Sequence, residues 1–550
     1  MARSRSEALP MALFALAVAL AGALLLTWLS DLTFWRDEWG FLLERRGFGA
    51  DVFLEPHYEH IAISLIAVYK ALQATFGMES ALPFQLVATA TFLLSIALLY
   101  VYVARRVGRW AALAAALPIL VLGPAWDDLL WPFQLGFFAS MSAGLGALLA
   151  LEREDRLGDL VACGLLTLAL TFSSLGIPFV AGAAVHVAWD RSRWRRAYVA
   201  AVPAAFYALW WLGWGHEGQS YASLHNLATS ISYVADGFAA SISSLLGLAG
   251  PRDQALASGL DWGRSLVLLA IAVSAWRLVR VGRVGRPLAA VVVIAVAFWF
   301  LAGLNASIFR EPTSGRYQYM GAVFVVLIAA ELWRGSRPQP RVAAVVLAIA
   351  CLAALSNLSS LRDAHSALIP FGDRQPAALA ALELTRDRID PQFELTEQNS
   401  GVDYLGFVDA ASYFDAADAF GSPAMTPTEL AAAPEIARAS ADTVLAAALE
   451  LELEPVPGGR PCPDARAAPR GSESTAELAG KPALLIAGAG AEVEVRLRRF
   501  ASASFPVELG SLERGEAATL AIPEDRSAEI WQLQLPAGDA LRICPQGGGE

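Results

Sequence analysis

Two pairs of neighbouring acidic residues, each flanked by tryptophans, are the stretches of this chain best suited to chemistry. They are Asp37-Glu38 and Asp127-Asp128, and both follow a long apolar run. Ionisable groups near the edge of a hydrocarbon layer are costly and usually functional. A carboxylate there can act as a general base, because partial burial raises its pKa toward the working range. The two pairs could equally bind a divalent cation such as Mg²⁺ or Mn²⁺ through oxygen ligands. The structural alternative is solvated loop acids beside Arg36.

Two arginines in a later segment are suited to binding an anionic group. Arg310, Arg316 and Tyr317 lie within the stretch 309–317. Arginine presents several donors in one plane and stays charged near lipid, so it suits a phosphate. Basic residues are less expected on the outer side of a membrane, where this segment is predicted to lie, which favours a binding role for Arg316. For Arg310, pairing with Glu311 or contact with lipid headgroups is an equal alternative.

Three further polar residues are candidates for contact with a substrate. His57 and His60 are three residues apart, so on a helix they would share a face. They could ligate a metal, contact a phosphate or relay a proton. A hydrogen-bonding role at the start of a helix is at least as expected. Gln134, one turn into a predicted helix, would bond either a substrate or a neighbouring helix.

The composition indicates a membrane protein. The chain has 550 residues, of which 56% are hydrophobic and 17% charged, and a soluble domain of this length could not bury so much apolar surface. Apolar runs of roughly 20 residues recur, as in a polytopic α-helical membrane protein. Residues 1–370 carry 27 basic and 23 acidic side chains, whereas residues 371–550 carry 14 and 29. A weakly basic membrane part followed by an acidic soluble part argues against a nucleic-acid partner.

The positions of the arginines predict the topology. Arg3 and Arg5 precede the first apolar run, which is too long for a cleaved signal peptide, so the N-terminus is expected in the cytoplasm. The segment 60–76 is predicted to be a helix lying along the membrane interface, within a first exterior loop, 30–78. A second long exterior loop is expected at 216–262. All dense arginine clusters then fall on the cytoplasmic side. The eleven predicted spans are 11–29, 82–103, 111–124, 132–151, 159–173, 175–189, 198–214, 264–279, 288–306, 317–333 and 342–359.

The membrane domain is predicted to occupy residues 1–360, and a soluble domain outside the cytoplasm residues 361–550. Helices are expected at 375–390 and 426–451. From 482 to 547 short runs alternate with turn residues, which predicts a small antiparallel β-sandwich. The predicted strands are 483–487, 493–500, 505–509, 518–522 and 530–535. Cys462 and Cys544 both lie in this domain, and a disulfide or two free thiols are equally expected.

The order of these motifs resembles the GT-C superfamily of membrane glycosyltransferases, which includes the protein O-mannosyltransferase and aminoarabinose-transferase-like branches. The similar features are an acidic pair in the first outside loop, a Pro/His element, an interfacial helix, a second acidic loop and an Arg-Tyr near a late helix. They cover roughly residues 10–335. In the commoner pattern a small residue and an aromatic follow the acidic pair, whereas here Trp39-Gly40 follow it.

The resemblance implies an inverting glycosyltransferase of the cell membrane. It would move a hexose or pentose from a polyprenyl-phosphate carrier to a glycan, lipid or protein acceptor of the cell envelope, surrounded by membrane lipids. Asp37 would deprotonate the acceptor hydroxyl, and Glu38 would position it or share that role. Asp127 or Asp128 would hold the acceptor or a metal. A lipid-linked phosphate is a good leaving group. Catalysis would therefore mainly need activation of the acceptor hydroxyl and stabilisation of the charge on the leaving phosphate.

Two other classes of protein also fit parts of the sequence. A transporter or lipid-carrier flippase would concentrate charge at mid-membrane and show broken helices in matched halves. In this chain the two acidic pairs and the two arginines lie in predicted outside loops, and the sequence shows no matched halves. A structural or sensory membrane protein would explain the acidic C-terminal region, but not the two acidic loops.

Overall fold

The computed structural model describes residues 2–249, 255–402, 405, 408–457, 462, 465–478, 482–488, 490 and 492–545. The chain divides into two compact units. Unit 1 comprises Met1–Ser30, Arg46–Leu72 and Leu82–Ala367. Unit 2 comprises Asp31–Arg45, Gln73–Ala81 and Leu368–Glu550. The two units are described separately below.

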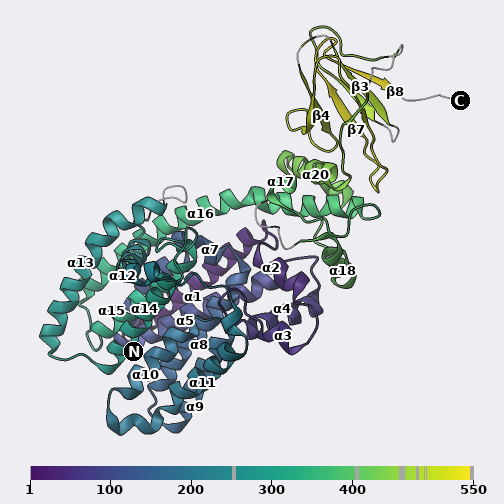
Figure 1. Cartoon of the computed structure of the whole chain (residues 1–550). Helices are drawn as coiled ribbons and strands as arrows, with labels where there is room; N and C mark the ends of the chain where they lie inside the picture. Colours follow the sequence, from purple (N-terminus) through teal and green to yellow (C-terminus); the bar gives the residue numbers. More distant parts are fainter. Residues whose placement is uncertain are drawn as a thin grey trace. The chain divides into compact units, whose positions relative to one another are not determined.

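Unit 1 is a bundle of α-helices joined by short turns (Figure 1). Within it, α8 packs against α5 and α9, and α14 packs against α10, α12 and α15. Two helices, α4 and α16, begin in unit 1 and end in unit 2. The helices are α1 (Ala2–Leu29), α3 (Ala50–Leu54), α4 (Ile63–Phe76), α5 (Leu82–Arg106), α6 (Arg109–Leu120), α7 (Trp126–Leu129), α8 (Leu135–Leu151), α9 (Arg156–Phe172), α10 (Gly176–Ala188), α11 (Tyr198–Gly213), α12 (Leu224–Leu245), α13 (Ala255–Val281), α14 (Arg286–Leu304), α15 (Gly315–Leu332) and α16 (Pro340–Thr385).

Five helical segments in the described part of the chain are long and apolar enough to cross a membrane. They are Ala8–Leu29, Leu82–Arg106, Pro132–Leu151, Arg286–Leu304 and Pro340–Thr385. A sixth arises if α6 and the segment Gly123–Leu129, bent by 53°, form one broken span. Each of the eleven predicted spans coincides with a helix. The count of eleven spans and the side on which each terminus lies remain predictions.

Three segments of unit 1 differ from the sequence prediction. The expected loop 216–262 contains the 22-residue helix α12. The predicted helices 342–359 and 375–390 both fall on one 46-residue helix, α16, which continues through Pro370 and Pro376 and ends at Thr385. The predicted helix 60–76 begins only at Ile63, because a tight turn precedes it.

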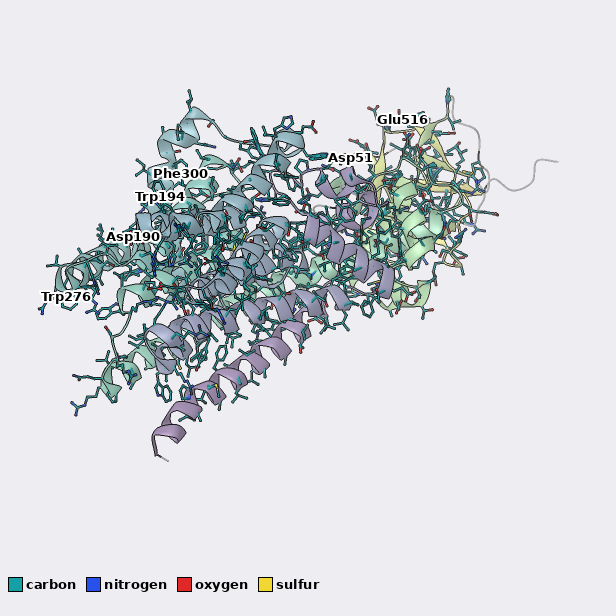
Figure 2. The ribbon with its side chains drawn as sticks, turned by 90° about the horizontal axis from the view of Figure 1, so that it is seen from below. Asp51, Asp190, Trp194, Trp276, Phe300 and Glu516 are labelled. Carbon is teal, nitrogen blue, oxygen red and sulfur yellow. A yellow bond between two sulfur atoms is a disulfide. The ribbon has the colours of Figure 1, made fainter. Side chains whose placement is uncertain are left out.

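Local side chains explain where several helices begin. The Asp155 side chain accepts a hydrogen bond from the Gly158 N–H at the start of α9, and Ser223 does the same for Asn226 at the start of α12. Large apolar side chains lie on the outside of unit 1. Trp194, Trp276 and Phe300, labelled in Figure 2, are 62%, 50% and 38% exposed. Such exposed apolar side chains are expected where helices face lipid.

Unit 2 combines short helices with β-strands. Its first segment, Asp31–Arg45, contains α2 (Asp37–Trp39) and a π-helix (Gly40–Glu44) with buried apolar residues. Further along the chain are α17 (Glu397–Ser400), α18 (Ala410–Phe420), α19 (Pro427–Ala432) and α20 (Glu435–Ala448). Capping boxes start two of them, since Thr396 pairs with Asn399 and Thr426 pairs with Glu429.

The strands of unit 2 form two four-stranded sheets with orders β1-β6-β3-β8 and β2-β7-β4-β5, in which the described pairings are antiparallel (Figure 1). The β-rich end predicted from the sequence is therefore confirmed. Alternation explains it: in β4, Val495 and Leu497 are fully buried while Glu494 is exposed. Cys462 and Cys544 are joined by a disulfide. The strands are β1 (Glu454–Pro455), β2 (Ser474–Leu478), β3 (Ala483–Ala487), β4 (Val493–Arg498), β5 (Val507–Leu512), β6 (Ala517–Leu520), β7 (Trp531–Leu535) and β8 (Leu541–Pro545).

Candidate functional site

The two predicted histidines lie in a tight turn, not on a helix. The His57 N–H donates to the His60 carbonyl and the His60 N–H donates to the His57 carbonyl, both at 2.9 Å. Tyr58, between them, has a φ of 52°, which suits a two-residue turn. The prediction that the histidines share a helical face is therefore wrong. The turn instead directs Glu59 into the protein.

Glu59 and Arg310 form a two-bond ion pair. The Arg310 Nη1 donates to Glu59 Oε1, and Nη2 donates to Oε2 at 3.1 Å. The side chains are only 21% and 12% exposed. The Tyr233 hydroxyl donates to the Arg310 carbonyl, and the Arg310 guanidinium lies 5.1 Å from the ring centroid of Tyr221. Arg310 thus pairs with Glu59, a residue 251 positions away, whereas the sequence suggested Glu311 as its acidic partner.

The charges around this turn shift the pKa values of two side chains. Burial acts to raise the pKa of Glu59, but its interactions with His60 and Arg310, including the hydrogen bonds from Arg310, outweigh this effect and lower the pKa. Burial lowers the pKa of His60, and the charges of Arg310 and Arg316 add to this effect against the opposing charge of Glu59. Glu59 is therefore ionised and His60 neutral at neutral pH. Since Arg316 acts on His60, the two arginines share one electrostatic environment.

Asp127 faces Arg316 across the start of α15. The Arg316 Nε lies 3.6 Å from Asp127 Oδ2, and the side chains are 29% and 8% exposed. This is an attraction of opposite charges and too long for a hydrogen bond. Gly315 allows the approach: a Cβ at this position would lie 3.0 Å from the Cβ of Asp127 and 3.2 Å from the carbonyl of Pro124. A side chain at residue 315 would push α15 away from α7.

Asp128 is more deeply buried than Asp127. Its residue is 1% exposed, and neither carboxylate oxygen has a hydrogen-bond partner among the described residues. Asp128 also borders a cavity of about 10 Å³, the size of one water molecule. A buried carboxylate without hydrogen bonds is costly, so this residue is a candidate for function rather than stability.

Gln134 and Tyr317 lie in packed surroundings. Gln134 is 5% exposed and ends the 3₁₀ turn Pro132–Gln134, just before α8. Tyr317 is 9% exposed, and its ring centroid lies 6.0 Å from those of both Phe298 and Trp299. Their predicted roles in binding acceptor and donor phosphate remain predictions.

The first acidic pair belongs to unit 2. Glu38 is fully buried, and its Oε2 accepts a hydrogen bond of 3.0 Å from the Trp35 N–H. Arg36 has a φ of 52°, and its guanidinium lies 3.9 Å from the centroid of the Trp35 ring. The Glu38 carboxylate therefore fixes the turn that carries Asp37, which is half-buried. The predicted roles of Asp37 and Glu38 remain predictions.

The structure thus brings together three stretches of unit 1 that are far apart in sequence: the 57–60 turn, the acidic helix α7 and the segment 310–317. Sequence reasoning missed Glu59 as a site residue. The sequence offers one signal: Glu59 is an acid between two histidines in a predicted exterior loop, and Arg310 is predicted on the same outer side of the membrane. Nothing in the sequence pairs Glu59 with Arg310, because the contact is tertiary.

No group of three or more His, Cys, Asp or Glu side chains in the described part of the chain is arranged to hold a metal ion. Asp127 and Asp128 supply the chemistry of an Mg²⁺ or Mn²⁺ site, since both offer carboxylate oxygens. Two neighbouring carboxylates fall short of the six or more oxygen ligands that such ions usually take. The predicted divalent cation is therefore not used in the proposals below.

Comparisons with known proteins place the chain as follows. No family model and no curated protein matches it. It is similar to the crystal structure of ArnT from Cupriavidus metallidurans bound to undecaprenyl phosphate, with a TM-score of 0.46 and 13% identity, over 75% of this chain and 85% of that chain. The TM-score and identity are too low for an inference about function, which is drawn from the residues themselves.

Proposed function

We propose that this protein is a membrane glycosyltransferase that moves a sugar from a polyprenyl-phosphate carrier to an extracytoplasmic glycan, lipid or protein. The observation that supports this proposal is the approach of Arg316 to Asp127 beside the buried carboxylate of Asp128, which has no hydrogen-bond partner among the described residues. A cation and two acids, held at one end of an apolar helical unit, suit a reaction in which a lipid-linked phosphate leaves and a hydroxyl is activated.

The proposed reaction is a single displacement. The acceptor oxygen forms a bond to the anomeric carbon of the sugar from the face opposite the phosphate. The bond between that carbon and the phosphate oxygen breaks, and its electron pair leaves with the polyprenyl phosphate. The acceptor proton goes to a carboxylate. One displacement inverts the configuration at the anomeric carbon.

Arg316 is the proposed ligand of the leaving phosphate. Asp127 Oδ2 lies 3.6 Å from the Arg316 Nε, and the attraction between the two charges orients the guanidinium. Arg310 is a weaker candidate, because Glu59 already accepts two hydrogen bonds from its guanidinium. In this proposal, the Glu59–Arg310 pair fixes the shape of the loops, and Tyr317 and the histidines line the phosphate's surroundings.

Asp37 is the proposed base, and Glu38 its positioning residue. The hydrogen bond from the Trp35 N–H holds Glu38 in a fixed orientation, whereas Asp37 is only half-buried. A base must reach a substrate hydroxyl, and a half-buried side chain can do so. Asp127 or Asp128, with Gln134, would then bind the acceptor.

The proposal is tested in cells that lack the protein. We expect the polyprenyl-phosphate sugar that it consumes to accumulate and the corresponding envelope glycan to be lost. Expression of the Asp37→Asn variant should leave this defect in place, with transfer reduced at least about 100-fold. Asp51→Asn is the matched control, because Asp51 lies in the same predicted exterior loop, on α3. Full rescue by Asp37→Asn, at equal protein level, contradicts the assignment of the base.

A further inference from the structure

Unit 1 also has a charged cavity, which lies at the end opposite to the candidate site. It has a volume of about 310 Å³ and is lined by residues of α5, α8, α10, α14 and α15. The candidate site described above lies at the N-terminus of α15, whereas this cavity is lined by Arg334, just past its C-terminus. An 18-residue helix is about 27 Å long, so the two sites are distinct.

The cavity is rich in arginine. Arg105, Arg106, Arg286 and Arg334 line it, against two lining acids, Glu152 and Glu154. Glu152 lies 3.1 Å from Arg105 Nη1 and 2.6 Å from Arg106 Nη2. Glu331 also accepts hydrogen bonds from two of these arginines, Arg106 and Arg334, so four positive side chains face three negative ones. The remaining positive charge attracts anions.

Two buried polar atoms at the cavity have no partner. His186 is 8% exposed, lines the cavity, and its Nε2 has no hydrogen-bond partner among the described residues. The Nε of Arg286 is likewise buried without a partner in that part of the chain, although its Nη2 donates to Glu154 at 2.6 Å. Native proteins rarely leave such atoms unsatisfied, so these atoms point to a bound group.

The backbone around the cavity also favours an anion. Arg286 is the first residue of α14, a 19-residue helix whose N-terminal N–H groups carry partial positive charge. Glu154 has a φ of 56° and accepts hydrogen bonds from both Arg193 and Arg286. An uncommon backbone conformation thus places this acid where it holds Arg286 at the cavity wall.

We infer that this cavity binds a phosphate group. Arginines provide planar donors for phosphate oxygens, and His186 Nε2 supplies a further polar contact. Leu148, Leu151 and Val291 form an apolar wall beside these groups. A phosphate that carries an apolar or neutral substituent fits both walls, as in a lipid headgroup. Free phosphate shares the same charged chemistry.

The inference is tested with purified protein in a neutral detergent. The thermal unfolding temperature is measured while inorganic phosphate, short-chain phosphatidylglycerol or short-chain phosphatidylcholine is added, since a ligand of the folded state raises this temperature. Saturable stabilisation by inorganic phosphate identifies a free-anion site. Saturable stabilisation by phosphatidylglycerol alone identifies a headgroup site. Both outcomes support the inference.

Variants decide whether the cavity is responsible. Arg286→Gln should raise the concentration for half-maximal stabilisation at least about tenfold, the equivalent of 1.4 kcal/mol. Arg283→Gln, which removes an exposed charge close by in sequence, should leave it unchanged. If Arg286→Gln does not fold, His186→Gln takes its place. The inference is overturned if neither anionic probe stabilises the wild-type protein more than phosphatidylcholine, or if the cavity variant and the control behave alike.

Discussion

Charged side chains near the two ends of α15 are buried to a similar degree but differ in their hydrogen bonds. Near its C-terminus, Glu331 is 7% exposed and accepts hydrogen bonds from Tyr102 at 2.6 Å, from Arg334 at 2.8 Å and from Arg106. Near its N-terminus, Asp128 is 1% exposed and has no hydrogen-bond partner among the described residues. A fully paired acid is explained by stability, whereas a buried acid without partners needs another explanation.

The two arginines at the N-terminal end also differ in their contacts. Arg310 is bound by both oxygens of Glu59, whereas the Nε of Arg316 lies 3.6 Å from Asp127 Oδ2. In the proposed function, Arg310 belongs to the framework and Arg316 binds the leaving phosphate. The following variants test these differences between the charged side chains.

The largest loss of stability is expected from Glu331→Ala. The substitution leaves Arg106, whose side chain is 3% exposed, as a buried charge that keeps only Glu152 as an acidic partner. Breaking a buried pair costs about 3–5 kcal/mol, so the free energy of unfolding in detergent should fall by that amount. A loss below about 1 kcal/mol would show that Glu331 does not hold this end together.

A smaller loss is expected from Glu59→Gln. The pair with Arg310 is partly accessible to solvent, with side chains 21% and 12% exposed. Removing the charge while keeping the shape should cost about 1–3 kcal/mol of unfolding free energy. The measurement is the same denaturant titration. If this variant loses more stability than Glu331→Ala, the ranking of the two clusters is wrong.

Acid should weaken the N-terminal end through His60. Because burial lowers the pKa of His60, the unfolded chain binds a proton more readily, and stability is lost as the pH falls below the usual value of 6.5. One proton limits the slope to about 1.4 kcal/mol per pH unit. Glu59, whose pKa is held below its usual 4.5, adds a further loss only below that pH.

The histidine contribution is isolated by His60→Gln. Thermal unfolding of the wild-type protein and the variant is compared between pH 7.5 and pH 5. The variant should lose less stability across this range than the wild-type protein. Equal losses would mean that His60 is not the group that titrates.

The smallest change in stability is expected from Asp128→Asn. The side chains have nearly the same shape, and the structure shows no hydrogen bond to the carboxylate from the described residues. Unfolding free energy should change by no more than about 0.5 kcal/mol, while sugar transfer falls. Circular dichroism and denaturant titration measure the first, and product formation the second. A loss of several kcal/mol would assign Asp128 to the framework.

Much of the fold could be predicted from the sequence, because hydropathy and alternation are local properties. Most helices and most strands follow from them, whereas the orientation of unit 1 that the arginines suggest stays a prediction. Helix α12 was missed because serines and threonines interrupt its apolar face. The continuation of α16 was missed because its apolar run ends near residue 359. Beyond that point, single residues at helical spacing, Leu361, Ala364 and Leu368, are buried instead.

The candidate site was predictable only in part. The two acidic pairs and Arg316 stand out because charged residues beside apolar segments are rare. The sequence could not identify Glu59 as a site residue or separate the roles of Arg310 and Arg316. The ion pair between Glu59 and Arg310 joins residues that lie far apart in sequence. The histidine turn was missed because a spacing of three fits both a helix and a two-residue hairpin turn.

The central claim is tested most directly by the reaction of purified protein with polyprenyl-phosphate sugars. Release of free polyprenyl phosphate is measured with the wild-type protein, Arg316→Gln and Glu311→Gln, in the presence of an envelope extract as acceptor. We expect the wild-type protein and Glu311→Gln to release the carrier at equal rates, and Arg316→Gln to be slower by at least about 100-fold. Equal release by all three proteins, or no release from any hexose or pentose donor by folded wild-type protein, would contradict the account.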